Sequence, residues 1–331
     1  MKKINLAIVG ATGLVGSTFL EVLSQSWLKD RIKNLYLFAS EKSTGKEVLF
    51  NNKTYLVESL SIKNIKNKLI DYAFFSVGED LSRRFAPIFA KYGVVVIDNS
   101  SAFRMVENVP LIVPEVNFEK TSKPIIANPN CSTIQCMLPL KLLQKNFGLK
   151  SVVYSTYQAV SGSGVKGIKD LEETKSGGLP KFYPYPIYNN CIPQIGSFDE
   201  TGYTSEERKM VYETRKILNL PNLKVSATCV RVPVENSHCV AVSVKLKKNF
   251  NLEKVKQIFR RGENLVLLDD VSQNVYPIND TSNGKNSVFV GRVRRDLFDK
   301  KVLHFWCVAD NIRKGASVNG VQILEKLLKN N

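Results

Sequence analysis

The N-terminal sequence joins an apolar segment to a cluster of glycines, and this junction constrains the fold more than any other feature of the chain. Residues 4–9 are typical of a strand and residues 17–23 of a helix. Gly10, Gly13 and Gly16 lie between them. In a dinucleotide-binding unit the first glycine permits a tight turn, the second admits a pyrophosphate and the third lets helix and strand pack closely. The spacing is a variant of the commoner pattern, and glycines that serve only a turn are the alternative.

The segment after the second predicted strand, residues 34–38, bears on the choice of cofactor. An NAD site usually places an acidic side chain here, on the ribose hydroxyls. This chain has Ser40, Glu41, Lys42 and Ser43 instead. The hydroxyls and Lys42 are suited to a 2′-phosphate, which predicts NADP, although Glu41 argues against it and Lys42 is also what a solvated loop would contain.

Strand and helix patterns continue to alternate over the first third of the chain. Residues 70–78 form a predicted strand that ends in small residues, and helix 81–91, strand 94–98 and a polar loop with Arg104 follow. This repetition predicts an α/β fold with a parallel sheet. After about residue 150 the strands have few helices between them, which favours a mixed or antiparallel sheet. The segment from Gly315 to Leu328 has the pattern of an amphipathic helix.

A cysteine lies between a short predicted strand, residues 124–127, and a long apolar helix, residues 133–143. The turn Asn128-Pro129-Asn130-Cys131 places its thiol at the N-terminus of that helix. Unpaired backbone N–H groups and the helix dipole favour the thiolate there, and a thiolate can attack a carbonyl carbon. The alternative is that Cys131 is one more small buried residue.

A nucleophilic cysteine needs a proton acceptor nearby, and the chain has two histidines. His304 alternates with apolar residues, which favours a structural role. His238 lies in a polar turn that follows Arg231-Val232-Pro233-Val234. His238 is therefore the better candidate for the partner of Cys131.

Composition limits the classes of protein to which the chain can belong. Its 331 residues are enough for two domains, and 44% hydrophobic with 23% charged residues is an ordinary globular composition. The formal charge of +17 could indicate nucleic-acid binding, but the lysines are scattered, and anionic small substrates fit the charge at least as well. No apolar run reaches the length of a membrane span, and the six cysteines lack metal-site spacing. We therefore expect reduced cysteines, no metal, no nucleic-acid or membrane partner, and a cytoplasmic location.

Taken together, these motifs resemble the aspartate-β-semialdehyde dehydrogenase family, nearly from end to end. The combination of the cysteine segment with the segment from Arg231 to His238 is highly specific. The resemblance rests on residues 10–16, 99–104, 129–135, 155–162, 227–234 with His238, and 310–316.

The resemblance implies a reaction and its catalytic residues. Cys131 would be the nucleophile, His238 the acid/base group and Gln158 a residue that orients the substrate. The reaction would be the NADPH-dependent reductive dephosphorylation of aspartyl-4-phosphate to aspartate-4-semialdehyde through a cysteine thioester, in lysine, threonine and methionine biosynthesis. An N-acetylglutamyl-phosphate reductase is the nearest alternative enzyme, and a non-catalytic dinucleotide-sensing protein is the alternative from another class.

The resemblance also implies substrate-binding residues. Arg231 would pair with the α-carboxylate, for which the forked guanidinium is well suited. Glu206 would face the substrate ammonium and Lys209 the phosphate, although such an i, i+3 pair is also common on helix surfaces. Arg104 and Asn130 match phosphate-site positions.

The cofactor implied by the resemblance is NADP. Lys42 stands where related sequences often have arginine, which predicts a weaker contact with the 2′-phosphate. The cofactor-binding residues that we predict are Gly10, Thr12, Gly13, Leu14, Val15, Gly16, Ser40, Lys42, Ser43, Ser76, Ser161, Gly162 and Asn311.

The predicted architecture combines an α/β Rossmann-type domain with an α+β domain that has a mixed sheet. We expect residues 1–130 and a C-terminal helix, 315–331, to form the dinucleotide-binding domain. Residues 131–314 would form the catalytic and dimerisation domain. A homodimer or a dimer of dimers is expected.

Overall fold

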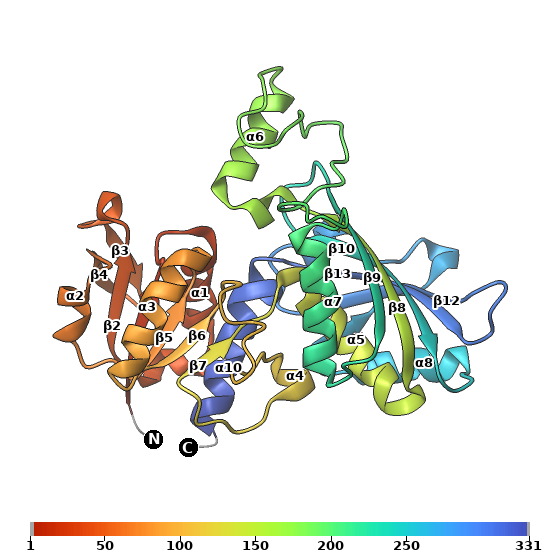
Figure 1. The fold of residues 1–331 in the computed structure, drawn as a ribbon, viewed down its shortest axis with the longest axis horizontal. Coiled ribbons are helices and arrows are strands. Elements are labelled where there is room, and N and C mark those ends of the chain that lie inside the picture. Colours follow the sequence, from red (N-terminus) through yellow and green to blue (C-terminus); the bar gives the residue numbers. More distant parts are fainter. Residues whose placement is uncertain (1–2, 330–331) are drawn as a thin grey trace. The chain divides into compact units, whose positions relative to one another are not determined.

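The computed structural model describes residues 3–329 (Figure 1). The chain divides into two compact units. The first contains the residues up to Pro129 together with those from Ala316 onward, and the second extends from Asn130 to Gly315. Each unit has its own sheet, so the predicted combination of a nucleotide-binding α/β fold with a second, mixed-sheet fold is confirmed.

The first unit is built on a seven-stranded sheet in the order β3-β4-β2-β1-β5-β6-β7. All neighbouring strands are parallel except β3 and β4, which form an antiparallel hairpin. Because β1 has β2 on one side and β5 on the other, the strand order reverses beside it, which is where α/β folds bind ligands. The strands are β1 (Ile4–Val9), β2 (Ile32–Ala39), β3 (Glu47–Phe50), β4 (Lys53–Ser59), β5 (Tyr72–Phe75), β6 (Val95–Asp98) and β7 (Ile125–Ala127).

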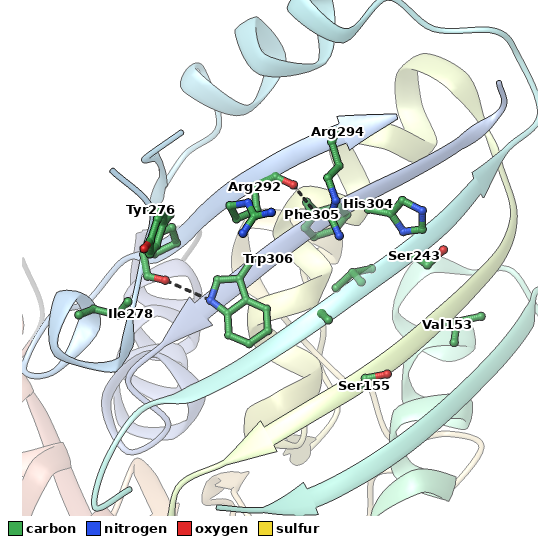
Figure 2. Close-up of a pocket in the computed structure, with 13 residues that line it drawn as sticks. Val153, Ser155, Ser243, Tyr276, Ile278, Arg292, Arg294, His304, Phe305 and Trp306 are labelled. Carbon is green, nitrogen blue, oxygen red and sulfur yellow. Dashed lines mark hydrogen bonds between the residues drawn. The ribbon is translucent and has the colours of Figure 1, made fainter. Parts of the chain in front are cut away.

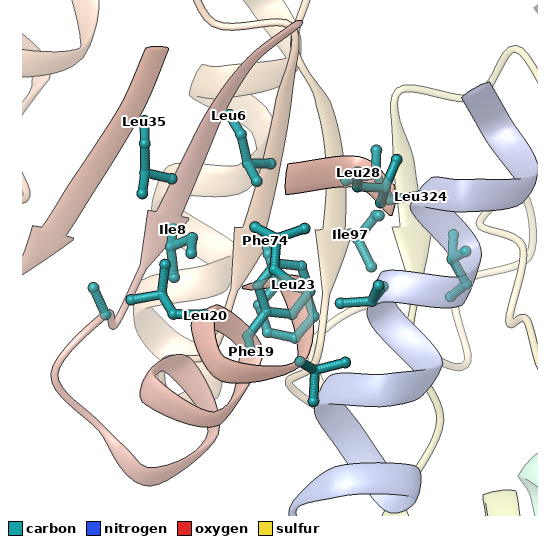
Figure 3. Close-up of a cluster of buried hydrophobic side chains, with 14 of the residues drawn as sticks. Leu6, Ile8, Phe19, Leu20, Leu23, Leu28, Leu35, Phe74, Ile97 and Leu324 are labelled. Atoms are coloured by element: carbon teal, nitrogen blue, oxygen red, sulfur yellow. The ribbon is translucent and has the colours of Figure 1, made fainter. Parts of the chain in front are cut away.

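Two helices cover one face of this sheet although they lie at opposite ends of the sequence. The helix α1 (Leu14–Gln25) contributes Phe19, whose ring stacks on that of Phe74 with centroids 3.9 Å apart (Figure 3). The helix α10 (Val318–Lys329) adds Ile323 and Leu324 to the same buried cluster. A separate cluster includes Phe85 and Phe89 of α3 (Glu79–Lys91). The burial of large apolar side chains from both ends of the chain therefore holds the first unit together.

The second unit is built on a six-stranded sheet in the order β11-β12-β13-β10-β8-β9. Its strands pair both ways: β8 and β9 are parallel, whereas β8 and β10 are antiparallel. The helices α5 (Cys131–Phe147), α7 (Ser205–Leu218) and α8 (Leu252–Arg260) pack against this unit's strands. The strands are β8 (Leu149–Gln158), β9 (Lys224–Arg231), β10 (His238–Leu246), β11 (Leu265–Leu267), β12 (Val288–Arg295) and β13 (Val302–Ala309).

Residues 165–200, for which we made no prediction of secondary structure, begin with the helix α6 (Val165–Lys175). Asp170, which is buried, organises the loop after α6. Its carboxylate accepts hydrogen bonds from the backbone N–H groups of Lys181, Phe182 and Tyr183. The short helices α2 (Ile62–Lys66), α4 (Pro114–Asn117) and α9 (Asn279–Ser282) complete the α-helices of residues 3–329. None of the helices described is both long and apolar enough to cross a membrane.

Candidate active site

The predicted site residues fall in both units, and the glycine turn belongs to the first. It connects the carboxyl end of β1 to the N-terminus of α1. A β-carbon on Gly16 would lie 2.2 Å from the carbonyl oxygen of Gly10, so no larger residue fits there. Ser76 Oγ donates to the carbonyl oxygens of Val9 and Gly10, which fixes the turn from the end of β5. Gly13 is the N-cap of α1 and has no side chain to occupy the helix N-terminus, which leaves room for a phosphate group.

The loop after β2 lies beside this turn. Thr12 Oγ1 donates a hydrogen bond of 3.3 Å to Ser43 Oγ, which connects the two segments. Ser40, Glu41 and Lys42 are exposed, so the Lys42 ammonium can approach a bound phosphate. Leu14 and Val15 open the first turn of α1. The first unit therefore brings together every cofactor-binding residue predicted up to Ser76.

Arg104 lies in the polar loop after β6. Its Nε donates to the carbonyl of Asn128 at 3.0 Å and its Nη2 to the carbonyl of Asn99 at 2.7 Å, so the guanidinium is fixed. The base of the loop is Asp98, a buried carboxyl that accepts from Ser82 and Ser100. Burial raises the pKa of Asp98, while the hydrogen bonds from the two serines and the charge of Arg104 oppose the shift.

Cys131 is the first residue of α5, in the second unit, and it is half-buried. The helix begins two residues earlier than the apolar pattern predicted because Asn130 caps it. Asn130 Oδ1 accepts hydrogen bonds from the N–H groups of Ser132 and Thr133, at 3.0 and 3.4 Å. This cap fixes the first turn of the helix, and with it the position of Cys131.

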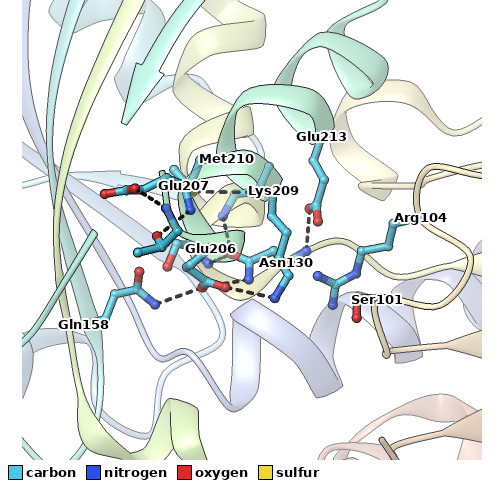
Figure 4. Close-up of polar contacts among 12 residues, drawn as sticks. Ser101, Arg104, Asn130, Gln158, Glu206, Glu207, Lys209, Met210 and Glu213 are labelled. Carbon is cyan, nitrogen blue, oxygen red and sulfur yellow. Dashed lines mark hydrogen bonds and ion pairs between the residues drawn. The ribbon is translucent and has the colours of Figure 1, made fainter. Parts of the chain in front are cut away.

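Glu206, on α7, connects three of the predicted site residues (Figure 4). Its Oε1 accepts from Asn130 Nδ2 at 2.9 Å and from Gln158 Nε2 at 3.1 Å, and Lys209 Nζ lies 3.1 Å from its Oε2. Burial alone would raise the pKa of Glu206, but Lys209, the two amides and Arg231 lower it to about 2. The side chain is therefore a carboxylate at neutral pH, and the pair with Lys209 is more than a surface contact.

Arg231 and His238 both bind the backbone of Ala159, one at its carbonyl oxygen and the other at its N–H. Arg231 ends β9, where it pairs in register with Gln158 of β8, and its Nη1 donates to the Ala159 carbonyl at 2.6 Å. The N–H of Ala159 donates to His238 Nδ1 at 3.0 Å. His238 is fully buried at the start of β10, not in a turn. Burial is the main cause that lowers the pKa of His238, to about 3, and the positive charge of Arg231 is the second. The charge of Glu206 opposes this shift.

The backbone of His238 is also close to the helix that carries the cysteine. Gln135, one turn after Cys131 on α5, donates from Nε2 to the carbonyl oxygen of His238 at 3.2 Å. Arg231 Nε and His238 Nε2 are buried and have no hydrogen-bond partner among residues 3–329. Two buried polar atoms are therefore available to a polar ligand.

The cofactor-binding residues predicted in the second unit lie next to Arg231 and His238. They are Ser161, Gly162 and Asn311. Asn311 Nδ2 donates to Ser161 Oγ at 3.0 Å, and Asn311 Oδ1 accepts from the N–H of Ser237 at 2.9 Å. A β-carbon on Gly162 would lie 2.9 Å from Arg231 Nη1. Gly162 therefore packs against Arg231 and His238 and leaves room for them.

Two residues of the site were missed by the sequence-based predictions. Glu213, buried on α7, accepts a hydrogen bond of 2.7 Å from the backbone N–H of Asn130. Its spacing from Glu206 and Lys209 places all three on one face of the helix, a periodicity that could have identified it. Ala159 acts only through its backbone, and no side-chain pattern can reveal that.

The other reactive side chains are less suited to catalysis. Cys136, Cys229, Cys239 and Cys307 are buried, and burial raises the pKa of the last three, that of Cys239 to about 12. His304 is bonded to Asp296 at 2.8 Å and lies outside this cluster of residues. Within residues 3–329 no group of three or more His, Cys, Asp and Glu side chains is arranged to hold a metal ion.

Comparisons with known proteins agree with this geometry. Residues 5–123 match a protein-family model described as the NAD binding domain of semialdehyde dehydrogenase, and residues 140–314 match its dimerisation domain. The aspartate-semialdehyde dehydrogenase of Aquifex aeolicus is 48% identical over 98% of both chains, and that of Campylobacter jejuni is 45% identical over 99% of this chain and 98% of its own. The chain belongs to the aspartate-semialdehyde dehydrogenase family. It is accordingly an oxidoreductase with the activity of that family, and the alternative of an N-acetylglutamyl-phosphate reductase is not favoured.

Solved structures of the family have the same fold. Aspartate-semialdehyde dehydrogenase II of Vibrio cholerae, in a complex with ASA, superposes with a TM-score of 0.92 at 41% identity, covering 99% of both chains. The Candida albicans enzyme with NADP gives a TM-score of 0.76 at 26% identity, again with 99% of both chains covered. The match of the N-terminal residues to an NAD binding domain supports a nicotinamide dinucleotide cofactor for this chain.

Proposed function

We propose that the chain interconverts aspartyl-4-phosphate and aspartate-4-semialdehyde with NADP as its cofactor and Cys131 as its nucleophile. The observation that carries this proposal is the position of Cys131 at the start of α5, directly after the Asn130 cap. The same cap donates to Glu206, which also binds Gln158. The nucleophile and the groups that would hold an amino-acid substrate are therefore parts of one hydrogen-bonded cluster.

In the biosynthetic direction, the Cys131 thiolate would attack the acyl-phosphate carbonyl. The sulfur electron pair forms the C–S bond, the carbon–oxygen bond to phosphate breaks, and a thioester on Cys131 results. The positive end of the α5 dipole, at whose first residue Cys131 stands, favours the negative sulfur and the developing oxyanion. The nicotinamide, when bound, supplies the hydride that reduces this thioester.

Charged side chains account for the recognition of the substrate. Arg231 has an unpartnered Nε within the described chain and would bind the α-carboxylate. Glu206, an anion at neutral pH, would bind the ammonium group, and Gln158 would orient the substrate. Lys209 and Arg104 would bind the phosphate. With these assignments, the site would favour an acyl phosphate that also carries a free amino group and a free carboxylate.

The first unit fits a dinucleotide phosphate. The Gly10–Gly16 turn would hold the pyrophosphate at the start of α1. Lys42 is exposed on the loop after β2, with Ser40 and Ser43 beside it, so it would pair with a 2′-phosphate. This charge favours NADP over NAD.

The decisive assay is phosphate-dependent reduction of NADP with aspartate semialdehyde, in the wild type and in Cys131→Ala. Activity that requires phosphate, and that Cys131→Ala lacks, supports the proposal. A parallel measurement is alkylation by iodoacetamide below neutral pH, mapped by mass spectrometry, where Cys131 should be modified before the exposed Cys191. Full activity in Cys131→Ala, or faster labelling of Cys191, would contradict the role of Cys131.

We further propose that two copies pair through the face of the second unit's sheet that carries Val153 and Tyr157, which are 48% and 41% exposed. Tyr157 packs on Trp306, with ring centroids 5.3 Å apart, beside a pocket on β8, β10, β12 and β13 (Figure 2). A large exposed apolar surface favours association, and the matched dimerisation domain includes these strands.

Sedimentation velocity tests the proposed dimer. Val153→Glu should produce monomers, whereas Leu49→Glu, at a residue of the first unit that is 72% exposed, should not. A dimer that survives Val153→Glu would locate the interface elsewhere.

Since all six cysteines are free of disulfides, a reducing compartment such as the cytoplasm is the location that we propose.

A further inference from the structure

The residue that precedes the proposed nucleophile is held by two glutamates of a single helix, α7 (Figure 4). Glu206 Oε1 accepts from the Asn130 side chain at 2.9 Å, and Glu213 Oε2 accepts from the Asn130 backbone N–H at 2.7 Å. Both glutamates and Asn130 are buried. The two glutamates lie about two helical turns apart, so their side chains are on one face of α7. This face therefore fixes both the side chain and the backbone of Asn130.

The bond from Glu213 completes a cap that α5 does not complete by itself. In a capping box, the third residue of the helix is a glutamate or glutamine whose side chain accepts from the N-cap N–H. In α5 that residue is Thr133, and its hydroxyl donates to Met210 Sδ at 3.5 Å. The N–H of Asn130, the N-cap, is bonded to Glu213 of a different helix.

The helix α7 shows the ordinary arrangement for comparison. The N–H of Thr204, its N-cap, donates to Glu207 Oε2 at 2.7 Å, and the N–H of Glu207 donates to the Thr204 hydroxyl. Both bonds of that box are made within one helix. At the start of α5 the two bonds are divided, since Asn130 accepts from the N–H of Thr133 and donates to Glu213. A hydrogen bond therefore locates the first turn of α5 relative to α7.

The position of Cys131 depends on this cap, because Cys131 is the next residue of the chain and the first of α5. It has little room to adjust on its own, since a β-carbon on Gly315 would lie 2.8 Å from the Cβ of Cys131. The helix α7 also carries Glu206 and Lys209, to which we assign the substrate ammonium and phosphate. A misplacement of about 1 Å between reacting groups can lower a rate about 100-fold.

We propose that Glu213 is a positioning residue of the reaction, which holds Cys131 in place relative to the substrate-binding groups of α7 by accepting the Asn130 N–H. This inference rests on the proposed function, since it takes Cys131 as the nucleophile and Glu206 and Lys209 as groups that bind substrate. Glu213 acts through Asn130 and takes no part in bond making or proton transfer. The role requires a hydrogen-bond acceptor at this point, and a neutral acceptor can fill it.

Two variants of equal charge test this role in the full-length protein. Glu213→Gln keeps an oxygen that can accept from the Asn130 N–H, whereas Glu213→Ala does not. We expect kcat for the phosphate-dependent oxidation of aspartate semialdehyde to be at least about tenfold lower in the alanine variant than in the glutamine variant. KM for the semialdehyde should change much less, because the side chains that bind substrate remain. Equal kcat values in the two variants would overturn the proposal.

The pH dependence of Cys131 alkylation by iodoacetamide provides a second measurement. The profile of Glu213→Ala should lie at higher pH than that of Glu213→Gln, because the α5 dipole stabilises the thiolate only when the first turn is in place. Superimposed profiles would contradict the positioning role. Thermal unfolding of the same samples identifies the variants that are folded in the assay. Glu213→Leu fills the space without offering an acceptor, so it replaces the alanine variant if that variant does not fold.

Glu207 provides a matched control on the same helix. It is also buried, and its Oε1 accepts from the backbone N–H of Cys229 at 3.0 Å. Glu207→Ala should therefore lose stability, while Cys131 keeps its wild-type alkylation profile. An equal shift of the profile in this control would show a general effect of α7 and would refute a specific role of Glu213. Failure of the proposed function has a different signature, since Cys131→Ala would then remain active whatever the Glu213 variants do.

Discussion

Replacement of Gly162 by alanine should disable the site through a steric clash, without removing any functional group. The added β-carbon would lie 2.9 Å from Arg231 Nη1 and 3.1 Å from both Cε1 and Nε2 of His238. Favourable contacts between such atoms occur at about 3.5–4.0 Å, so the two side chains must move apart by roughly half an ångström. Neither can do so freely, because the backbone of Ala159 binds both: its carbonyl oxygen accepts from Arg231 and its N–H donates to His238.

The expected magnitude follows from these contacts. Overpacking a site of this kind costs about 1–3 kcal/mol of folding stability. Displacement by a fraction of an ångström of Arg231 and His238, to which we assign roles in the reaction, should lower kcat/KM at least about tenfold, since a misplacement of about 1 Å can cost about 100-fold. A loss of folding stability of this size leaves most of the protein folded. The loss of activity should therefore be much larger than the loss of folded protein.

The assay combines steady-state kinetics in the oxidative direction with thermal unfolding of the same samples. Gly177→Ala is the matched control, because Gly177 has φ +84° and, among the described residues, no heavy atom within 4 Å of the added carbon. That control adds backbone strain without a clash, so it should lose stability and keep its activity. Wild-type kcat/KM in Gly162→Ala, or an equal loss in the control, would refute the reasoning.

Three further predictions follow from the charges of the site. Arg231→Lys keeps the charge but loses the fork, so kcat/KM should fall at least about tenfold while alkylation of Cys131 stays unchanged; normal kinetics would make Arg231 structural. Lys42→Ala should raise KM for NADPH and leave NADH nearly unaffected, and an equal change for both cofactors would exclude contact with the 2′-phosphate. His238 has a folded pKa of about 3, below the value of about 6.5 expected in the unfolded chain, so the unfolded state binds more protons between these two values and stability should fall with decreasing pH. Urea unfolding at several pH values should show a loss that approaches about 1.4 kcal/mol per pH unit below about pH 6, which His238→Gln should remove.

Local patterns in the sequence predicted most strands and helices of the first unit, because each has an apolar period and a clear boundary. The hairpin of β3 and β4 was missed although its signal was present. Asn51 and Asn52 join the two strands with φ of 49° and 61°, the positive values that a two-residue hairpin turn requires and that asparagine tolerates. The start of α5 was placed two residues late because the capping role of Asn130 depends on geometry.

The site was harder to predict than the fold because it depends on register and backbone. That Gln158 lies beside Arg231 follows from the parallel register of β8 and β9, which no local pattern encodes. His238 resembles a turn residue in the sequence but begins β10, where the neighbouring strands bury it. Its Nδ1 accepts a hydrogen bond from the backbone N–H of Ala159, and the type of residue at position 159 does not indicate this contact.

The return of the chain to its first unit has a consequence for synthesis on the ribosome. Val318, Val321, Ile323, Leu324 and Leu327 of α10 belong to the buried cluster around β1 and α1. The residues of β1 and α1 therefore lack part of their core until α10 has been translated, whereas the second unit is contiguous and can close earlier. We therefore expect the second unit to fold before the first, and the apolar surface that α10 covers to be exposed until then.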